Sequence, residues 1–261
     1  MARSPHRIAF DSSRRREGRS CNAGSLSPPG NRASAYGHRG APAGSLVARC
    51  RVPWLRRFRG ETMEIPFFFD YACPWAYLGN CRVEPYLRDL GVEIDFRPVS
   101  LKVLYEPPPD GAGRPKLGGR KRDNYAGDLR HWADFVGADF AAEQPKSRPD
   151  SDLLLRAAFV AKDAGRFREF HYPAYRARWA EARDVARPEV VRRLLEGAGL
   201  DGAEALSRAE SPELAERLQC ESQAAVARGV FGVPTLFVGD EMFWGNDRFE
   251  LVRHYVAKAS D

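Results

Sequence analysis

The sequence predicts an α/β fold in which a helical domain is inserted between a β-α-β half and a β-β-α half. An apolar run at residues 64–70 precedes a helical pattern and then an alternating segment at 92–99. Helical periodicity follows over most of residues 121–229. Two short strand patterns and a closing helix complete the chain.

The β-α-β half begins with EIPFFFD at 64–70, which is bounded by charge and short enough for a buried strand. The apolar residues after it recur at helical spacing up to Gly91, a natural end for a helix. Residues 92–99 alternate as a second strand. A helix between two such strands implies that they are parallel and joined by a right-handed crossover.

The middle of the chain departs from the strand pattern. Residues 101–119 are rich in proline and glycine, and we expect them to form a loop. Helices are expected where periodic segments have suitable start or stop residues, at 121–136, 151–165, 166–182, 188–197 and 212–229. Residues 101–229 are therefore assigned to an inserted helical domain.

The β-β-α half follows. Residues 235–238 and 241–244 are expected to pair across a hairpin turn at Gly239-Asp240, and a helix is expected at 249–259. This order of elements is that of the thioredoxin fold. Residues 63–100 and 230–261 would together form the thioredoxin-like domain, with one four-stranded sheet.

Residues 1–62 differ in composition from the rest of the chain. They contain 13 arginines and 3 acidic residues, a net charge of about +10, and show no periodicity. Three interpretations are open: a disordered tail, a transit peptide, or upstream sequence included through an early start codon. We favour the last, because Met63 directly precedes the first strand pattern.

The composition of residues 63–261 argues against several classes of function. Their 28 basic and 32 acidic residues make them mildly acidic, which disfavours nucleic-acid binding. No stretch approaches the roughly eighteen apolar residues of a membrane span. Two of the five cysteines lie in residues 1–62, and the other three show neither paired nor metal-like spacing, so we expect a cytoplasmic protein without a metal site.

Cys73-Pro74 is the first candidate for chemistry. Cys73 would lie at the N-terminus of the first helix, where exposed N–H groups and the helix dipole favour a thiolate. Pro74 suits the first helical position, and a buried structural cysteine is the alternative interpretation. The motif reads CPWA, so Ala76 occupies the position of a resolving cysteine.

Two further motifs lie near the C-terminus. In GVFGVPT, we expect a cis bond before Pro234, which exposes the backbone of Val233 for pairing with an extended ligand. An ordinary trans proline at a strand start is the alternative. In FWGNDRFE, Asn246 and Asp247 would cap the last helix, and together with its N–H groups they suit a zwitterionic amino-acid head group.

These motifs resemble the 2-hydroxychromene-2-carboxylate isomerase family, which is close to kappa-class glutathione transferases within the DsbA-like superfamily. The resemblance rests on FDYACPWAYL, KRDNYAGDLRHWADFVG, the RAAFVAKDAGRF and YRARWAEARDV segments, and GVFGVPTLFVGDEMFWGNDRFE. It covers essentially all of residues 63–261. It implies a DsbA-like fold, a small-molecule substrate and glutathione as the cofactor, and it is compatible with a homodimer.

The resemblance also implies roles for single residues. The glutathione sulfur would lie at the start of the first helix, and its cysteinyl backbone would pair with Val233. Asn246 and Asp247 would meet the γ-glutamyl end. A basic residue, Lys121 or Arg122, would meet the glycyl carboxylate. The substrate pocket would be lined by residues of two helices, Pro74, Trp75 and Trp132.

Cys73 departs from the family pattern, because the family mostly has serine at this position. A serine hydroxyl can only donate to a glutathione thiolate, whereas a cysteine can also form a mixed disulfide. Two enzymatic functions therefore stay open: a glutathione-dependent isomerase or transferase acting on a small aromatic electrophile, and a monothiol DsbA-like thiol–disulfide oxidoreductase. A binding module without catalysis is the third interpretation.

Overall fold

The computed structural model describes residues 62–106, 118–144 and 150–260, which all belong to one compact unit spanning Ala41–Asp261. The three interpretations of the N-terminal segment concern residues outside these ranges. Within these ranges, no helix has the length and apolar character needed to cross a bilayer.

The four strands form a single mixed sheet in the order β2-β1-β3-β4. The strands are β1 (Glu64–Phe69), β2 (Glu93–Pro98), β3 (Thr235–Val238) and β4 (Glu241–Trp244). Strand β1 runs parallel to β2 and antiparallel to β3, with Phe67 opposite Leu236. Strands β3 and β4 form the expected hairpin. The two halves of the chain therefore meet in one sheet, as predicted.

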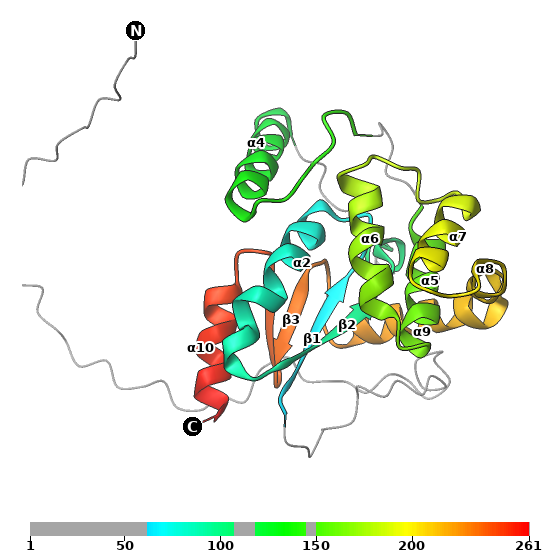
Figure 1. Cartoon of the computed structure of the whole chain (residues 1–261). Coiled ribbons are helices and arrows are strands. Elements are labelled where there is room, and N and C mark those ends of the chain that lie inside the picture. The colour runs from blue at the N-terminus through cyan, green and yellow to red at the C-terminus, as the bar shows by residue number, and fades with distance from the viewer. Residues whose placement is uncertain (1–61, 107–117, 145–149, 261) are drawn as a thin grey trace, which may run out of the picture. The chain divides into compact units, whose positions relative to one another are not determined.

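Helix α2 (Pro74–Leu87) and the 3-10 turn η2 (Arg88–Leu90) connect the two parallel strands. Helix α10 (Phe249–Ser260) closes the chain and contacts β3, α2 and η2. Figure 1 shows α2 and α10 together on the side of the sheet facing the viewer. The closing helix of the chain therefore packs beside the helix that joins the two parallel strands.

The inserted segment contains more helix than predicted. Its helices are α3 (Leu101–Leu104), α4 (Gly119–Val136), α5 (Asp152–Asp163), α6 (Phe167–Trp179), α7 (Pro188–Gly197), α8 (Gly202–Glu210) and α9 (Pro212–Ala227). Helix α4 lies alone at residues 119–136, whereas α7, α8 and α9 follow one another at residues 188–227. Helices α5 to α9 lie beside one another and away from α10 (Figure 1).

Two of these helices correct the sequence analysis. Helix α3 lies where a loop was expected, and its first N–H group, that of Leu101, donates to the buried carboxylate of Asp70 at 2.8 Å. Helix α8 was not expected, because its buried face consists of small residues such as Ala205 and Ala209, which give little hydrophobic periodicity. Its N-terminus is capped by Asp201, whose carboxylate accepts two backbone N–H groups.

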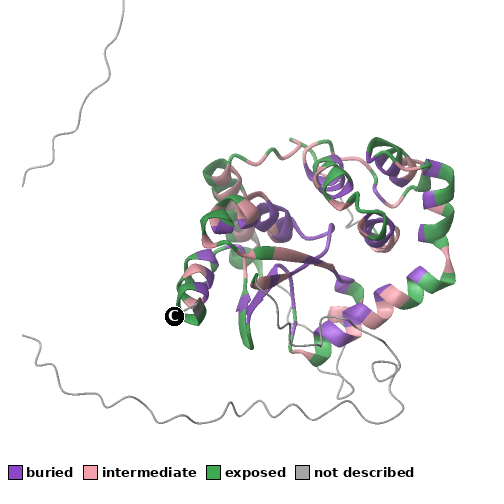
Figure 2. Ribbon diagram, turned by 60° about the horizontal axis from the view of Figure 1, so that its bottom comes forward, coloured by how far each residue is buried: buried purple, intermediate pink, exposed green. Residues whose placement is uncertain are grey.

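One hydrophobic core serves the thioredoxin-like part and the inserted helices alike. Phe67, Phe68 and Phe69 of β1 are completely buried, and so are Phe170 and Tyr175 of α6. Figure 2 shows the buried residues along the strands and on the inner sides of the surrounding helices. The inserted helices therefore help to bury the strand that leads to the candidate site.

Candidate functional site

The candidate site begins at the turn between β1 and α2. The N–H group of Cys73 donates to the carbonyl of Asp70 at 3.0 Å, which closes this turn. Cys73 has an extended backbone conformation and immediately precedes the helix, with Pro74 at its first position. Its side chain does not cap the helix. The position of a resolving cysteine is filled by the buried Ala76.

The thiol of Cys73 points to the loop before β3. It donates a hydrogen bond to the backbone carbonyl of Val233, with 3.2 Å between sulfur and oxygen. The peptide bond between Val233 and Pro234 is cis, which confirms the prediction. The two motifs that the sequence analysis treated separately therefore form one site, and the sulfur is nearly buried, with Cys73 only 4% exposed.

Close packing fixes this loop against α2. A Cβ atom at Gly79 would lie 3.1 Å from Cγ of Pro234, so a larger residue there would push the helix and the loop apart. A Cβ atom at Gly232 would lie 2.9 Å from Nε1 of Trp244. The Thr235 hydroxyl also donates to the carbonyl of Gly232 at 2.7 Å. The two glycines thus allow the backbone approach that the site requires.

The GND motif is attached to the same loop. The N–H group of Gly245 donates to the carbonyl of Pro234 at 2.9 Å. Asn246 is buried, and its side-chain NH2 group has no hydrogen-bond partner among the residues that the structure describes. Asp247 is exposed and pairs with Arg248 at 2.5 Å. Asn246 and Asp247, which we expect to bind the head group, therefore directly follow Gly245, whose N–H group binds the cis-proline loop.

The remaining predicted residues belong to or contact α4. Lys121 is exposed in the first turn of α4, and the side chain of Arg122 lies outside the described part. Trp75 packs edge-to-face on Tyr125, with 5.4 Å between the ring centroids. The Trp132 ring lies 5.2 Å from the guanidinium of Arg82 in α2 and 5.5 Å from the ring of Phe135.

Sequence reasoning missed a buried polar chain below the site. The Tyr71 hydroxyl lies 2.9 Å from Nδ1 of His171, and Nε2 of His171 lies 2.8 Å from Oδ1 of Asn80. Burial lowers the pKa of His171 well below its usual value, so the ring is neutral. A neutral ring can accept from the tyrosine and donate to the amide oxygen. Asn80 and Tyr71 lie 91 and 100 positions from His171 in the sequence, so no local sequence pattern could reveal this series of hydrogen bonds.

Tyr175 was also missed. Its ring lies 4.8 Å from that of Tyr71 and 5.7 Å from that of Tyr77, which flank Cys73 in the sequence. Its hydroxyl is buried and has no hydrogen-bond partner among the described residues. Burial raises the pKa of Tyr175 well above its usual value, and the charges of Tyr71 and Cys73 add to this effect. The hydroxyl is therefore a neutral, unused donor in the layer of rings near the active-site turn.

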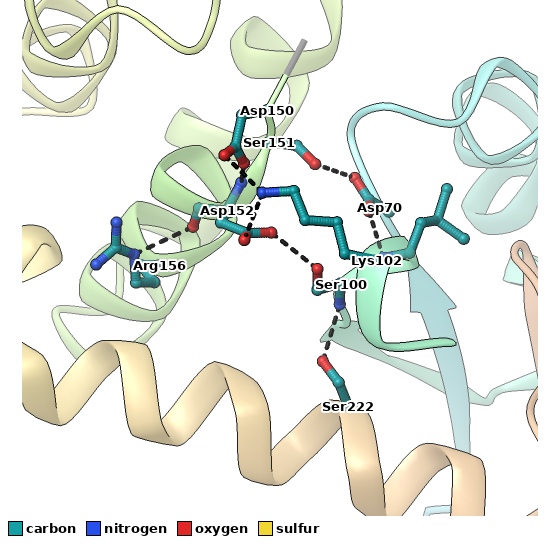
Figure 3. A network of polar contacts seen from close by, with 9 residues as sticks. Asp70, Ser100, Lys102, Asp150, Ser151, Asp152, Arg156 and Ser222 are labelled. Carbon is teal, nitrogen blue, oxygen red and sulfur yellow. Dashed lines mark hydrogen bonds and ion pairs between the residues drawn. The ribbon is translucent and has the colours of Figure 1, made fainter. Parts of the chain in front are cut away.

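A second polar network holds the active-site turn to the inserted helices (Figure 3). The buried carboxylate of Asp70 accepts from the N–H groups of Ala72 and Leu101, both at 2.8 Å, and from the hydroxyl of Ser151 at 2.6 Å. Burial raises the pKa of Asp70, and these three donors oppose that rise. One side chain thus connects the turn before Cys73 to the starts of α3 and α5.

Neighbouring residues extend this network. The hydroxyl of Ser100 donates to Asp152 at 2.8 Å, and the same carboxylate pairs with Lys102 at 2.9 Å. The backbone N–H group of Ser100 donates to the hydroxyl of Ser222 in α9 at 2.9 Å. Figure 3 shows these groups between the end of the sheet and α5. The network therefore links the turn before Cys73 to α3, α5 and α9.

The chemistry available here is that of a single thiol at a helix N-terminus. The thiol lies beside the backbone carbonyl of Val233 in the cis-proline loop, and Gly245 of the GND motif is hydrogen-bonded to the same loop. In residues 62–106, 118–144 and 150–260, no group of three potential metal ligands gathers. The geometry suits binding of a thiol peptide or attack on a disulfide, since both need a sulfur near this turn.

Comparisons with known proteins show what the described part of the chain is similar to. The family model of the DSBA-like thioredoxin domain matches residues 64–257. A 2-hydroxychromene-2-carboxylate isomerase from Pseudomonas putida is 30% identical over 189 residues, which cover 71% of this chain and 90% of the relative. One from Sphingobium xenophagum is 28% identical over 201 residues, which cover 75% and 98%.

Solved structures of the same fold also align with this chain. A structure of 2-hydroxychromene-2-carboxylate isomerase aligns with a TM-score of 0.63 and 26% identity, covering 76% of this chain and 96% of the other. A probable DsbA oxidoreductase from Streptomyces coelicolor aligns with a TM-score of 0.61 and 23% identity, covering 76% and 89%. The second similarity supports the fold alone.

Proposed function

Because the chain belongs to the DSBA-like thioredoxin domain family, with 2-hydroxychromene-2-carboxylate isomerases among its relatives, we propose that it is a glutathione-dependent isomerase or transferase acting on a small aromatic electrophile. The observation that carries the proposal is the hydrogen bond between the Cys73 thiol and the Val233 carbonyl. It brings a sulfur-binding helix start next to a backbone that can pair with a peptide.

The described residues fit glutathione. Val233 offers its backbone at the entrance to β3, where an extended peptide can add as a short strand. The buried NH2 group of Asn246 lacks a partner among the described groups. The carboxylate of Asp247 is exposed, and an ammonium group would share it with Arg248. Lys121, exposed at the start of α4, carries the positive charge that a glycyl carboxylate needs.

Glutathione supplies a nucleophilic thiolate that can add to a double bond of the substrate and leave again after bond rotation. Cys73 would stabilise that sulfur by donating its S–H group, once the thiol turns away from the carbonyl of Val233. The N–H groups at the start of α2 would add to this stabilisation. Trp75, half-buried at the same helix start, would form one wall of the substrate pocket.

The second candidate is a monothiol thiol–disulfide oxidoreductase, and the cysteine at position 73 is the observation that favours it. The Cys73 thiolate would attack a disulfide, form a mixed disulfide and release one thiol. Because Ala76 replaces a resolving cysteine, a second thiol, such as glutathione, would have to reduce the mixed disulfide. The product would be a new disulfide and free Cys73.

Two measurements distinguish the candidates. With 2-hydroxychromene-2-carboxylate as the probe substrate, we expect glutathione-dependent isomerisation, followed by the change in ultraviolet absorbance. Mass spectrometry of protein incubated with oxidised glutathione measures the mixed disulfide at Cys73. Isomerisation without dependence on glutathione, or no isomerisation together with rapid mixed-disulfide turnover, would overturn the first candidate.

A further inference from the structure

Arg82 of α2 joins the candidate head-group loop to the body of the protein. Its Nη1 atom donates to the backbone carbonyl of Asn246 at 2.9 Å. Its Nη2 atom lies 3.5 Å from a carboxylate oxygen of Glu250 in the first turn of α10. The side chain is only 10% exposed, so this guanidinium is held inside the structure.

Aromatic rings surround the same guanidinium. The centroids of four rings lie 5.1–5.6 Å from its central carbon, those of Tyr86, Trp132, Phe135 and Phe249. These rings come from α2, α4 and α10. Arginine suits this position, because its planar and weakly hydrated group can stack on rings while its N–H groups donate at the edge. A single side chain therefore connects three helices.

The loop at residues 245–248 is thus held at two points. On one side, the N–H group of Gly245 donates to the carbonyl of Pro234, next to the Cys73 thiol. On the other, Arg82 binds the carbonyl of Asn246. The Cα atom of Asn246 lies between these two backbone bonds, and its buried NH2 group has no partner in the described part.

We propose that Arg82 is a positioning residue for the γ-glutamyl head group, which orients Asn246 and Asp247 and couples this loop to α4. The inference rests on the proposed glutathione site and adds a residue that does not touch the ligand. In this arrangement Trp132 acts by packing on Arg82, so that α4, which carries Lys121, and the head-group loop are held by the same side chain. Both ends of the tripeptide site depend on Arg82.

A merely structural brace is the competing explanation, and Arg253 provides a matched control. Arg253 of α10 donates to the carbonyl of Tyr86 at 2.6 Å and pairs with Asp89 at 2.6 Å. Its guanidinium also lies 5.4 Å from the Tyr86 ring centroid. It therefore joins α10 to the end of α2 and to η2 through a carbonyl, a carboxylate and a ring, and these contacts lie outside residues 245–248.

The experiment compares Arg82→Met with Arg253→Met by two measurements on the full chain. Hydrogen–deuterium exchange of the ligand-free protein reports the order of residues 245–248. Titration calorimetry with reduced glutathione reports affinity. In Arg82→Met we expect at least about tenfold faster exchange in this loop and about tenfold weaker glutathione binding. In Arg253→Met we expect both to stay within about twofold of the wild type, even if the melting temperature falls equally.

The outcomes separate the two proposals. Wild-type protein that does not bind glutathione would overturn the proposed function and this inference with it. Wild-type binding that Arg82→Met leaves unchanged would overturn the inference alone, and so would equal losses in both variants. If Arg82→Met does not fold, Arg82→Lys is measured in the same way. It keeps one charged donor but not the planar stacking, and a loss of about threefold is expected, whereas no loss would contradict the inference.

Discussion

The thiol of Cys73 lies 3.2 Å from the backbone carbonyl of Val233 and donates a hydrogen bond to it, although 160 residues separate them in the sequence. The contact joins the start of α2 to the cis-proline loop. It also occupies the carbonyl that a bound peptide would use. The proposed function therefore requires a ligand to replace the Cys73 thiol as the hydrogen-bond donor to this carbonyl.

Cys73→Ser tests whether the thiol acts as a donor. A serine hydroxyl occupies nearly the same place and also donates, so we expect at least about a tenth of the wild-type kcat/KM in the glutathione-dependent isomerisation, a loss of no more than about 1.4 kcal/mol. Cys73→Ala, which lacks a donor, should lose more. A folded but inactive serine variant would instead indicate that Cys73 is the nucleophile, since an unactivated serine reacts poorly.

Asp247→Ala tests the head-group site. The carboxylate would contact the non-reacting end of glutathione equally in the ground state and the transition state, so its loss should raise KM for glutathione far more than it lowers kcat. Asp240→Ala, at an equally exposed position in the hairpin turn, is the control and should change neither. A variant at position 247 with wild-type KM would remove Asp247 from the site.

Tyr175→Phe and Tyr71→Phe form a matched pair for stability. The Tyr175 hydroxyl is buried without a partner among the described groups, so its removal should leave the free energy of unfolding unchanged or raise it by about 1 kcal/mol. The Tyr71 hydroxyl bonds to His171, so its removal should cost about 1–3 kcal/mol. Urea denaturation measures both. Equal losses would show that Tyr175 has a partner in solution.

His171 predicts how stability depends on pH. Burial lowers the pKa of His171 well below its usual value near 6.5, so the unfolded chain takes up a proton at a higher pH than the folded protein. The free energy of unfolding should therefore fall by about 1.4 kcal/mol per pH unit from this group, once the pH drops below about 6.5.

His171→Gln keeps a donor and an acceptor but cannot take up this proton. We expect its stability, measured by urea denaturation from pH 8 to pH 5, to be lower at pH 8 and to vary less with pH than that of the wild type. His254→Gln, on the exposed side of α10, is the control and should keep the wild-type slope. An unchanged slope in His171→Gln would refute the assignment.

Asp70→Asn tests the support of the active-site turn. The carboxylate accepts three hydrogen bonds, and an amide has one acceptor oxygen, so at least one donor would lose its partner. We expect a loss of about 2–3 kcal/mol in the free energy of unfolding, against about 1 kcal/mol for Ser151→Ala, which removes a single bond. A loss in Asp70→Asn no larger than in Ser151→Ala would show that the other two bonds contribute little.

Local sequence patterns predicted the fold because its elements carry their own signals. The alternating run at β2 and the apolar run at β1 are typical of strands, and Gly239-Asp240 marks the hairpin between β3 and β4. Cys73-Pro74 and Val233-Pro234 could be recognised because each lies at a junction of two elements. Helices α3 and α8 were missed, since a tertiary hydrogen bond holds the first and small residues form the buried face of the second.

The sequence by itself thus determined the order of the strands and of most helices, the single thiol at the start of α2, the cis bond before Pro234 and the membership of a family. Only the tertiary structure decided which side chains surround that thiol. Two contacts join residues far apart in the chain: the buried hydrogen bond between Tyr71 and His171, and the packing of the Trp132 ring on Arg82. Such contacts are stronger when they are buried away from water. No short stretch of sequence shows which distant residues will be buried together.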